Sequence, residues 1–249
     1  MKTILLTNDD GVAAEGLRTL SVELRNIAHV LVVAPEQNRS AISHGLTIHS
    51  RMKFEEIEPD NFSLNGTPAD CVIHALGNLF VNPPDLVISG INHGANLGDD
   101  IMYSGTVAAA REAARYGIPA IAVSQEYDDG KKIRFTEGSI LVKNMVLNMF
   151  RNGINGELLL NINIPMGKIK GLKITRQAYS EQTKHFDASN SKWNAPPHDS
   201  LYFLKNEIST DRKAVSAGYV SITPLQRDQT DYLDAQSLFD SAEQLFGKA

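Results

Sequence analysis

Two adjacent carboxylates stand near the start of the chain, in the string Asn8-Asp9-Asp10-Gly11, directly after the apolar run at residues 3–7. Neighbouring carboxylates repel each other and raise each other's pKa, and a cation placed between them removes that conflict. Asp-Asp-Gly is also a common turn string and can cap a following helix. The acidic couple, Asp9 and Asp10, therefore indicates either a metal site or a turn.

Two further oxygen donors follow later apolar runs. Ser40 closes the string Asn38-Arg39-Ser40 after the run at 30–34, and Asn92 follows the run at 85–89. Because ligands bind at the carboxyl ends of the strands in an open parallel sheet, these loops are expected to converge on one edge. Two carboxylates, a hydroxyl and an amide oxygen form a hard ligand set, suited to Mg²⁺ or Mn²⁺ rather than to zinc.

A glycine-rich segment at residues 90–106, GINHGANLGDDIMYSGT, leads into a helical run at 107–115. Its glycines let backbone amides approach an anion, and a helix N-terminus adds unpaired N–H groups with a favourable dipole. The spacing matches neither GxGxxG nor a Walker loop. The segment therefore outlines a phosphate cradle at Ser104, Gly105 and Thr106, although Ser104 and Thr106 can instead be helix caps.

Three charged or titratable side chains lie beside these candidate ligands. Arg39 can neutralise a phosphate by a bidentate contact, or it can pair with a surface acid. His44 and His93 can donate a proton to a leaving alkoxide, although a single histidine is more often structural.

The composition lies in the ordinary range of globular proteins. With 249 residues, 42% hydrophobic and 21% charged, the chain can form one main domain with an appendage. A net charge of −5 gives no positive field for a nucleic acid polymer or an anionic membrane. The single cysteine, Cys71, excludes an internal disulfide. Neither a secretory h-region nor a membrane-spanning apolar run is present, so a cytoplasmic protein is expected.

The first part of the chain alternates short apolar runs with segments of helical period, which is typical of βαβ units around a parallel sheet. We predict an α/β fold with a Rossmann-like, mostly parallel sheet flanked by helices, carrying the metal and phosphate site within residues 1–165. The predicted strands are 3–7, 30–34, 85–89, 120–124 and 158–164, and the predicted helices are 15–24, 69–79, 106–116 and 137–150.

From residue 166 the sequence pattern changes to short runs of alternating apolar and polar residues, interrupted by Gly, Pro, Ser and Asn. Residues 166–249 are predicted to form hairpins or loops, an exposed arm around Trp193 and Pro196-Pro197, and a closing amphipathic helix at 231–246. Projecting arms often exchange between protomers, so this region is predicted to support oligomerisation.

Five strings in order, NDDG, VAPEQNRSAIS, GTPADCV, SGINHGANLGDD and YSGTVAAAREA, resemble those of the SurE survival-protein family of metal-dependent 5′/3′-nucleotidases. The resemblance implies hydrolysis of nucleoside monophosphates with one divalent metal ion, Mg²⁺ or Mn²⁺, per subunit, in a homodimer or homotetramer. Carried over residue by residue, it implies metal ligands at Asp9, Asp10, Ser40 and Asn92. It also implies phosphate contacts at Ser104, Gly105 and Thr106, and a pocket lined by Ser43 and Asn96.

The expected mechanism is metal-assisted attack of water on the phosphate, in which Asp9 takes the proton of the water and no phosphoenzyme forms. One rival is a haloacid-dehalogenase type of phosphatase, which attacks through an aspartate where this chain has Asn8. Another is a regulatory nucleotide-binding module without turnover, for which two carboxylates beside the phosphate bring no gain. A dinucleotide-dependent dehydrogenase lacks its glycine fingerprint here.

Overall fold

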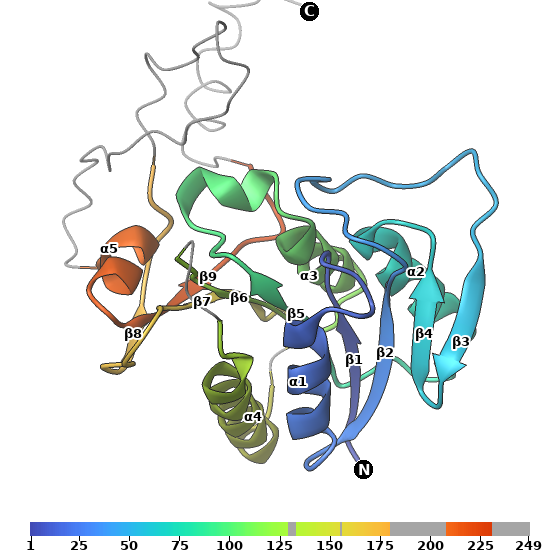
Figure 1. Ribbon diagram of the computed structural model, residues 1–249, viewed down its shortest axis with the longest axis horizontal. Helices are drawn as coiled ribbons and strands as arrows, with labels where there is room; N and C mark the ends of the chain where they lie inside the picture. Colours follow the sequence, from blue (N-terminus) through green and yellow to red (C-terminus); the bar gives the residue numbers. More distant parts are fainter. Residues whose placement is uncertain (129–132, 155, 180–207, 231–249) are drawn as a thin grey trace, which may run out of the picture.

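The computed structural model describes residues 1–128, 133–154, 156–179 and 208–230, and these form one layered α/β unit built on a nine-stranded sheet (Figure 1). The strand order is β3-β4-β2-β1-β5-β6-β7-β9-β8. The strands are β1 Thr3–Thr7, β2 His29–Pro35, β3 Phe54–Glu58, β4 Asn61–Leu64, β5 Leu86–His93, β6 Ala120–Gln125, β7 Leu159–Ile164, β8 Leu172–Ile174 and β9 Val220–Pro224. The helices are α1 Glu15–Leu24, α2 Pro68–Asn78, the 3₁₀ helix η1 Gly98–Met102, α3 Gly105–Arg115, α4 Phe135–Asn152 and α5 Asp211–Ser216.

The six central strands, β4, β2, β1, β5, β6 and β7, run parallel, which confirms the predicted fold class. From β1 the chain first builds the sheet outward through β2 and β4, and then returns to place β5 on the other side of β1. The carboxyl ends of β1 and β5 therefore meet at the point where the strand order reverses, which is where open α/β sheets bind ligands. This is the edge at which the sequence places the acidic couple.

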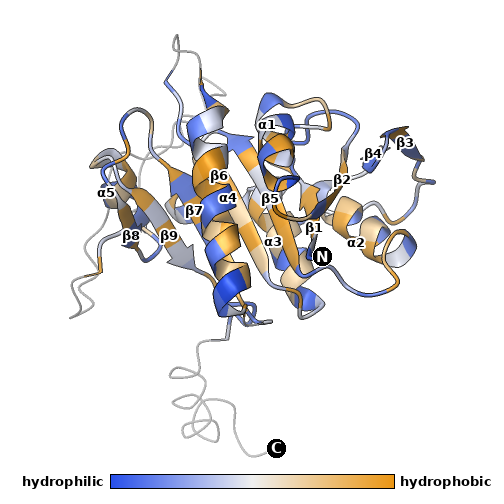
Figure 2. Cartoon of the chain, turned by 90° about the horizontal axis from the view of Figure 1, so that it is seen from below, coloured by the Kyte–Doolittle hydropathy of each residue, from blue (hydrophilic) through white to orange (hydrophobic). Residues whose placement is uncertain are grey.

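Helices cover both faces of the sheet because successive side chains of a buried strand point to opposite sides. In β1, Ile4 and Leu6 pack with α1 and α4, whereas Leu5 packs on the other side with α2 and α3. Figure 2 shows the central strands coloured mainly as hydrophobic, between the helices. The near-continuous apolar runs of the sequence thus reflect burial on both faces.

Strand β5 is longer than predicted, and this changes the setting of Asn92. The sequence placed Asn92 in a loop after a strand ending at Ser89, but pairing with β6 resumes beyond a bulge, with Asn92 opposite Ser124. Gly90, at φ 138°, sits in that bulge, and a Cβ there would lie 2.2 Å from the Val123 carbonyl oxygen. The bulge lets the strand continue and carries Asn92 on ordered backbone instead of on a free loop.

The sheet continues beyond residue 165. Strand β9 pairs antiparallel with β7, and β8 pairs parallel with β9, so these two strands extend the main sheet in a region predicted to hold hairpins or loops. About 45 residues, with α5 among them, separate β8 from β9, and such a connection suits parallel neighbours. The division of the chain at 165/166 stays a prediction. The arm around Trp193 and the helix predicted at 231–246 lie outside the described residues.

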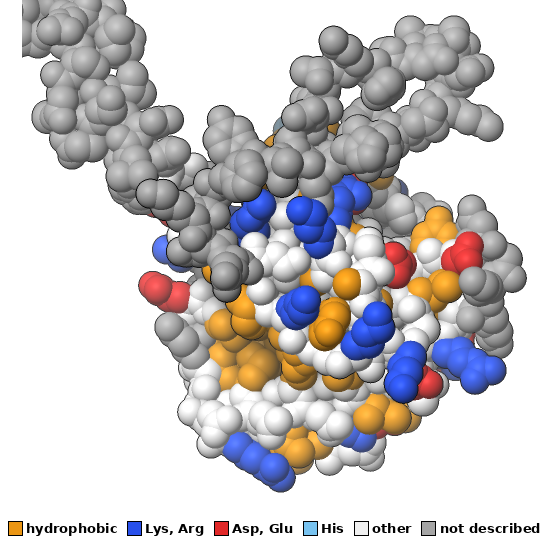
Figure 3. Space-filling view, turned by 90° about the vertical axis from the view of Figure 1, so that its left-hand side faces the viewer, with side chains coloured by type: hydrophobic (Ala, Val, Ile, Leu, Met, Phe, Trp, Pro, Cys, Tyr) orange, Lys and Arg blue, Asp and Glu red, His pale blue; other side chains and the backbone are white. Residues whose placement is uncertain are grey.

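The end of the sheet that carries β8 exposes apolar side chains among basic ones (Figure 3). Leu172 and Ile174 are half or more exposed, at 50% and 61%, and Lys173 lies over the ring of Tyr219. Lysine beside an exposed edge strand discourages unwanted strand pairing. None of the helices in the described part of the chain is both long enough and apolar enough to cross a membrane.

Helix α1 approaches β5 so closely that only glycine fits at residue 16. A Cβ on Gly16 would lie 2.1 Å from the Ile91 carbonyl oxygen. We expect Gly16→Ala to lower the free energy of unfolding by about 3 kcal/mol, because the helix or the strand must shift. Urea denaturation measures this change.

Gly77→Ala in α2 provides the matched control, since no atom lies within 4 Å of a Cβ added there. It should raise stability by up to about 1 kcal/mol through helix propensity. Equal urea midpoints for the two variants would contradict the packing of α1 described here.

Candidate active site

A cavity of about 560 Å³ opens at the carboxyl ends of β1 and β5. It draws on the loop after β1, the loop after β2, the end of β5, and the segment leading into α3. In Figure 1 these loops lie along the top edge of the sheet. The lining residues are Asp9, Ser40, Ala41, Asn92, His93, Gly94, Ala95, Asn96, Asp100, Tyr103 and Ser104. Five of the predicted site residues, Asp9, Ser40, Asn92, Asn96 and Ser104, therefore share one cavity.

Asp9 is buried, with 3% of its surface exposed, and it binds the N-terminus of α3. Its Oδ1 accepts a hydrogen bond from the Thr106 hydroxyl at 2.5 Å, and its Oδ2 accepts one from the Thr106 N–H at 3.1 Å. Burial and, to a smaller extent, the neighbouring Asp10 charge raise the pKa of Asp9 to about 6, against the lowering effect of the Thr106 bonds. Near neutral pH this carboxylate can release or take up a proton.

Asp10 lies beside the end of β5. Its Oδ2 accepts a hydrogen bond from the His93 N–H at 2.9 Å, which places it next to Asn92. Burial also raises the pKa of Asp10, and the bond from His93 opposes that rise. The Asn92 amide nitrogen donates to the Gly94 carbonyl oxygen at 2.9 Å, which leaves its amide oxygen as the end that can act as a ligand. The acidic couple and Asn92 thus lie together across β1 and β5.

Ser40 is held by its own loop and by the backbone of Asp9. Its N–H donates to Asn38 Oδ1 at 2.7 Å, and the Arg39 N–H donates to the Asp9 carbonyl oxygen at 2.7 Å. The Arg39 guanidinium instead donates to the Asn65 carbonyl oxygen, at 3.4 Å, and it does not line the cavity. Arg39 forms no ion pair with the described residues, and its guanidinium bonds the Asn65 backbone outside the cavity lining.

Ser43 and His44 tie the loop after β2 to neighbouring elements. The Ser43 hydroxyl donates to the Met102 carbonyl oxygen at 2.7 Å, so Ser43 supports the cavity wall from outside the lining. His44 Nε2 lies 2.8 Å from Oε2 of Glu112, whose side chain is almost fully buried. These contacts favour a structural role for His44. His93 is the histidine that lines the cavity, with its ring against Tyr127.

The predicted phosphate cradle forms the start of α3. The Ser104 hydroxyl accepts a hydrogen bond from the Val107 N–H and caps the helix, which was the alternative to a phosphate contact in the sequence analysis. Gly105 lies so close to Asp9 that an added Cβ would be 2.9 Å from the Asp9 Cβ. Both Thr106 donors are bound to Asp9. The Gly105 N–H, in the first turn of the helix, has no partner within its own helix and can receive an anion.

The electrostatic character of the cavity argues for a cation. Asp9 and Asp100 line it, Asp10 lies beside it, and its lining contains no lysine or arginine among the described residues. A phosphate dianion entering alone would be repelled by the acidic couple, and only Asp100 among these carboxylates has an ion-pair partner in the described residues, Arg212. Within that same part of the chain, no three His, Cys, Asp or Glu side chains cluster as a metal site. A hard dication here would draw on the two carboxylates of the acidic couple, with the hydroxyl of Ser40 and the amide oxygen of Asn92.

Asp100 and Tyr103 line the cavity and were not singled out from the sequence. Arg212 bonds Asp100 Oδ2 at 3.2 Å, and burial raises the pKa of Asp100 against that pairing. Both residues lie inside strings quoted above, GANLGDD and YSGT. The sequence analysis thus quoted the segments that contain both residues, but the spacing did not show that these two side chains face the cavity.

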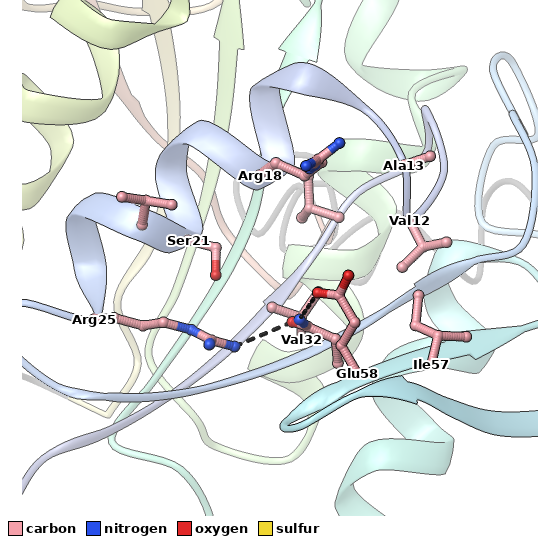
Figure 4. Close-up of a pocket in the computed structure, with 11 residues that line it drawn as sticks. Val12, Ala13, Arg18, Ser21, Arg25, Val32, Ile57 and Glu58 are labelled. Atoms are coloured by element: carbon pink, nitrogen blue, oxygen red, sulfur yellow. Dashed lines mark hydrogen bonds between the residues drawn. The ribbon is translucent and has the colours of Figure 1, made fainter.

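Another cavity, of about 350 Å³, lies between α1, β2 and the β3–β4 hairpin (Figure 4). Arg25 donates to Asn61 Oδ1 at 3.1 Å, and the Asn61 amide nitrogen donates to Glu58 at 3.1 Å. Glu58 is the carboxylate among the described residues of its lining, and it is engaged by that bond. This cavity lacks a pair of carboxylates and does not fit the predicted chemistry.

The raised pKa of Asp9 predicts a pH-dependent loss of stability in metal-free protein. A folded-state pKa of about 6, against 3.8 when unfolded, means that the folded state holds this proton more tightly. The penalty is absent below pH 3.8, grows as pH rises, and is complete above pH 6, at about 3 kcal/mol. We therefore expect the stability of Asp9→Asn relative to wild type to rise by about that amount between pH 4 and pH 7.

Urea denaturation with a chelator present measures this difference, and Glu56→Gln, at an exposed position in β3, gives the baseline. A difference between Asp9→Asn and wild type that stays constant with pH would contradict the assigned protonation of Asp9.

Comparisons with known proteins agree on one family. A family model described as survival protein SurE matches residues 4–184. A protein named 5′-nucleotidase SurE from Histophilus somni is 42% identical over 239 residues, covering 92% of this chain and 94% of that protein. The protein of the same name from Haemophilus influenzae is 40% identical over 255 residues, covering 98% and 99%. The crystal structure of the SurE protein from Aquifex aeolicus superposes with a TM-score of 0.81 at 38% identity, covering 98% of this chain and 99% of the other.

Proposed function

Because this chain belongs to the SurE family of survival proteins, we propose that it is a 5′-nucleotidase, a phosphatase that hydrolyses nucleoside 5′-monophosphates to nucleoside and phosphate. Nucleoside 3′-monophosphates are a further candidate substrate. The observation that carries the proposal is the cavity at the β1/β5 switch point, in which Asp9 meets Ser40 and Asn92 beside the N-terminus of α3.

We propose Asp9, Asp10, Ser40 and Asn92 as the ligands of one Mg²⁺ or Mn²⁺ ion per subunit. When bound, such an ion would supply positive charge that offsets the carboxylates and polarises the phosphate. The proposal is supported by the hard oxygen donors of these residues and by the raised pKa values of Asp9 and Asp10. It also explains how an anionic substrate can enter an acidic cavity.

The residues of the chain would then divide the work of hydrolysis. Asp9, whose carboxylate lines the cavity, would take the proton of the attacking water. The N–H of Gly105, at the start of α3, would hold a phosphate oxygen as its charge develops. His93 lines the cavity and would protonate the leaving alkoxide of the nucleoside. Asn96 and Ser104 would complete the substrate contacts.

The geometry disfavours a covalent aspartyl-phosphate route. Asn8, which occupies the place of a nucleophilic aspartate, is fully buried and exchanges hydrogen bonds with Gly11 on both ends of its amide. It shapes the turn that presents the acidic couple. The proposed mechanism is therefore direct attack by water, and an acid-stable phosphoenzyme trapped during turnover would contradict it.

Assembly into a homodimer or homotetramer is part of the proposal and rests on the sequence of the region after residue 166. Sedimentation of the purified protein measures it directly.

Phosphate release from a panel of nucleoside monophosphates tests the function. We expect turnover of 5′-monophosphates with Mg²⁺ or Mn²⁺ present, and little turnover of nucleoside triphosphates or sugar phosphates. A protein that binds adenosine monophosphate (AMP) equally well with and without metal, and releases no phosphate, would instead be a regulatory binding module.

A further inference from the structure

The cavity wall at residues 96–100 is held from behind by the chain on either side of residues 180–207. Asp211, at the start of α5, is fully buried. Its Oδ2 accepts a hydrogen bond from the Gly98 N–H at 2.9 Å, and its Oδ1 accepts one from the Ala178 N–H at 3.0 Å. One carboxylate therefore joins the wall to two segments that are distant in sequence.

Two neighbouring side chains repeat this connection. Arg212 donates to the Leu97 carbonyl oxygen at 3.1 Å and to Asp100 Oδ2 at 3.2 Å. The Gln177 amide nitrogen donates to the Gly98 carbonyl oxygen at 3.0 Å. Both polar groups of the Gly98 backbone are thus bound by the C-terminal part of the chain.

The same wall is fixed from the other side by β7. The Asn96 carbonyl oxygen accepts hydrogen bonds from Asn161 at 2.9 Å and from Asn163 at 3.0 Å, and the Asn96 N–H donates to Asn163. Beyond the wall, the Ser104 N–H donates to the Asp100 carbonyl oxygen at 3.1 Å, at the entry to α3. A shift at Gly98 would therefore move Asp100 and the entry to α3 relative to Asn96, which β7 holds in place.

We propose that Asp211 is a positioning residue of the nucleotidase site, which seats the 96–100 wall so that substrate is bound in register with the acidic couple. The proposal rests on the proposed function. From the sequence, the region after residue 166 was associated only with oligomerisation. Under this proposal, part of that region also positions a wall of the active-site cavity. Asp211 itself does not line the cavity, and its hydrogen bonds go to Gly98, Ala178 and Arg212 instead of to a proposed metal ligand.

A buried carboxylate is tolerated here because backbone donors compensate for its lost hydration. Besides Gly98 and Ala178, its own neighbour Arg212 donates a backbone N–H to Oδ1 at 2.8 Å. Asn in place of Asp211 keeps the shape but turns one acceptor into a donor, so the N–H of Gly98 or of Ala178 faces an amide nitrogen. The wall should then loosen while the sheet behind it remains intact.

The test compares Asp211→Asn with wild type and with Asp85→Asn. Asp85 also accepts a backbone hydrogen bond, from Thr3 at 2.8 Å, but it lies at the opposite, amino-terminal end of β5. We expect Asp211→Asn to raise KM for AMP by about tenfold, with metal affinity within twofold of wild type. A purely structural defect would reduce the folded fraction, and thus the apparent kcat, without changing KM. Asp85→Asn should leave KM unchanged.

Hydrogen exchange followed by mass spectrometry gives a readout that does not depend on activity. Amides in peptides covering residues 96–104 should exchange faster in Asp211→Asn, while peptides covering 3–35 keep the wild-type rate. Unchanged KM and unchanged exchange at 96–104 would overturn the positioning role. If wild type releases no phosphate, the proposed function fails, and the exchange of residues 96–104 alone decides the role of Asp211.

Discussion

Replacing Asp10 with asparagine is expected to lower kcat/KM for nucleoside 5′-monophosphates by about a thousandfold or more with the fold intact. Asn keeps an oxygen that can accept the His93 N–H bond now made by Asp10 Oδ2, so the backbone geometry can persist. The variant loses the negative charge that would help to hold a dication beside Asn92. A defect of this size, without unfolding, is what the loss of a proposed metal ligand should produce.

The same substitution should leave stability equal or raise it. Burial raises the pKa of Asp10, and its charge also raises the pKa of Asp9, so both effects show a charge that is unfavourable in metal-free protein. Sites built for chemistry often carry this conflict between activity and stability. Lower activity combined with an equal or higher urea midpoint would distinguish a functional carboxylate from a structural one.

Asp60→Asn is the matched control for charge removal. Asp60 lies at the turn between β3 and β4 with φ at 61°, a conformation that asparagine accepts readily. Its activity should stay within twofold of wild type. Near-wild-type activity in Asp10→Asn would remove the metal-site assignment, and a collapse of both variants would point to a general effect of charge.

The sequence predicted the central elements well because their signals are local. Strand β1 was predicted with its observed bounds, and α1 likewise, since near-continuous apolar runs and helical spacing need no partner to be recognised. The β3–β4 hairpin was missed because β3, Phe54–Glu58, is mostly exposed and acidic and has no apolar period. Strand β9 was missed because its place beside β7 depends on a pairing with a strand about sixty residues earlier.

For the candidate site, too, the local sequence pattern predicted which segments contribute, but not the contacts between distant residues. Asp9, Ser40 and Asn92 were expected at one edge because strand ends converge in a parallel sheet, and they line one cavity. Ser104, expected from the glycine-rich segment, and Asn96, expected from the family resemblance, line the same cavity. The spacing of residues in the sequence did not show where each side chain points. The Arg39 guanidinium bonds the Asn65 carbonyl oxygen, and the Ser43 hydroxyl bonds the Met102 carbonyl oxygen. The part played by Asp211 was also hidden, because its contact with Gly98 joins residues 113 apart.

Removing divalent ions is expected to reduce phosphate release by at least about a hundredfold. The substrate phosphate would enter a cavity lined by Asp9 and Asp100, with no lysine or arginine in its described lining. Two like charges about 4 Å apart, at an effective dielectric constant of about 20, repel by about 4 kcal/mol, or about a thousandfold in binding. The Gly105 N–H and the α3 dipole offset only part of this repulsion, because such a dipole contributes about 0.3–1 kcal/mol.

The measurement is AMP hydrolysis by metal-depleted protein before and after adding back Mg²⁺ or Mn²⁺. Activity should return fully, because removing the ion exposes the charges of Asp9 and Asp10 without breaking the bonds from Thr106 and His93 that hold them. Circular dichroism through the cycle separates loss of metal from loss of fold. Undiminished turnover after depletion would contradict the metal-ion proposal. The acidic couple would then have to bind phosphate in its protonated form, which the pKa of about 6 at Asp9 disfavours at neutral pH.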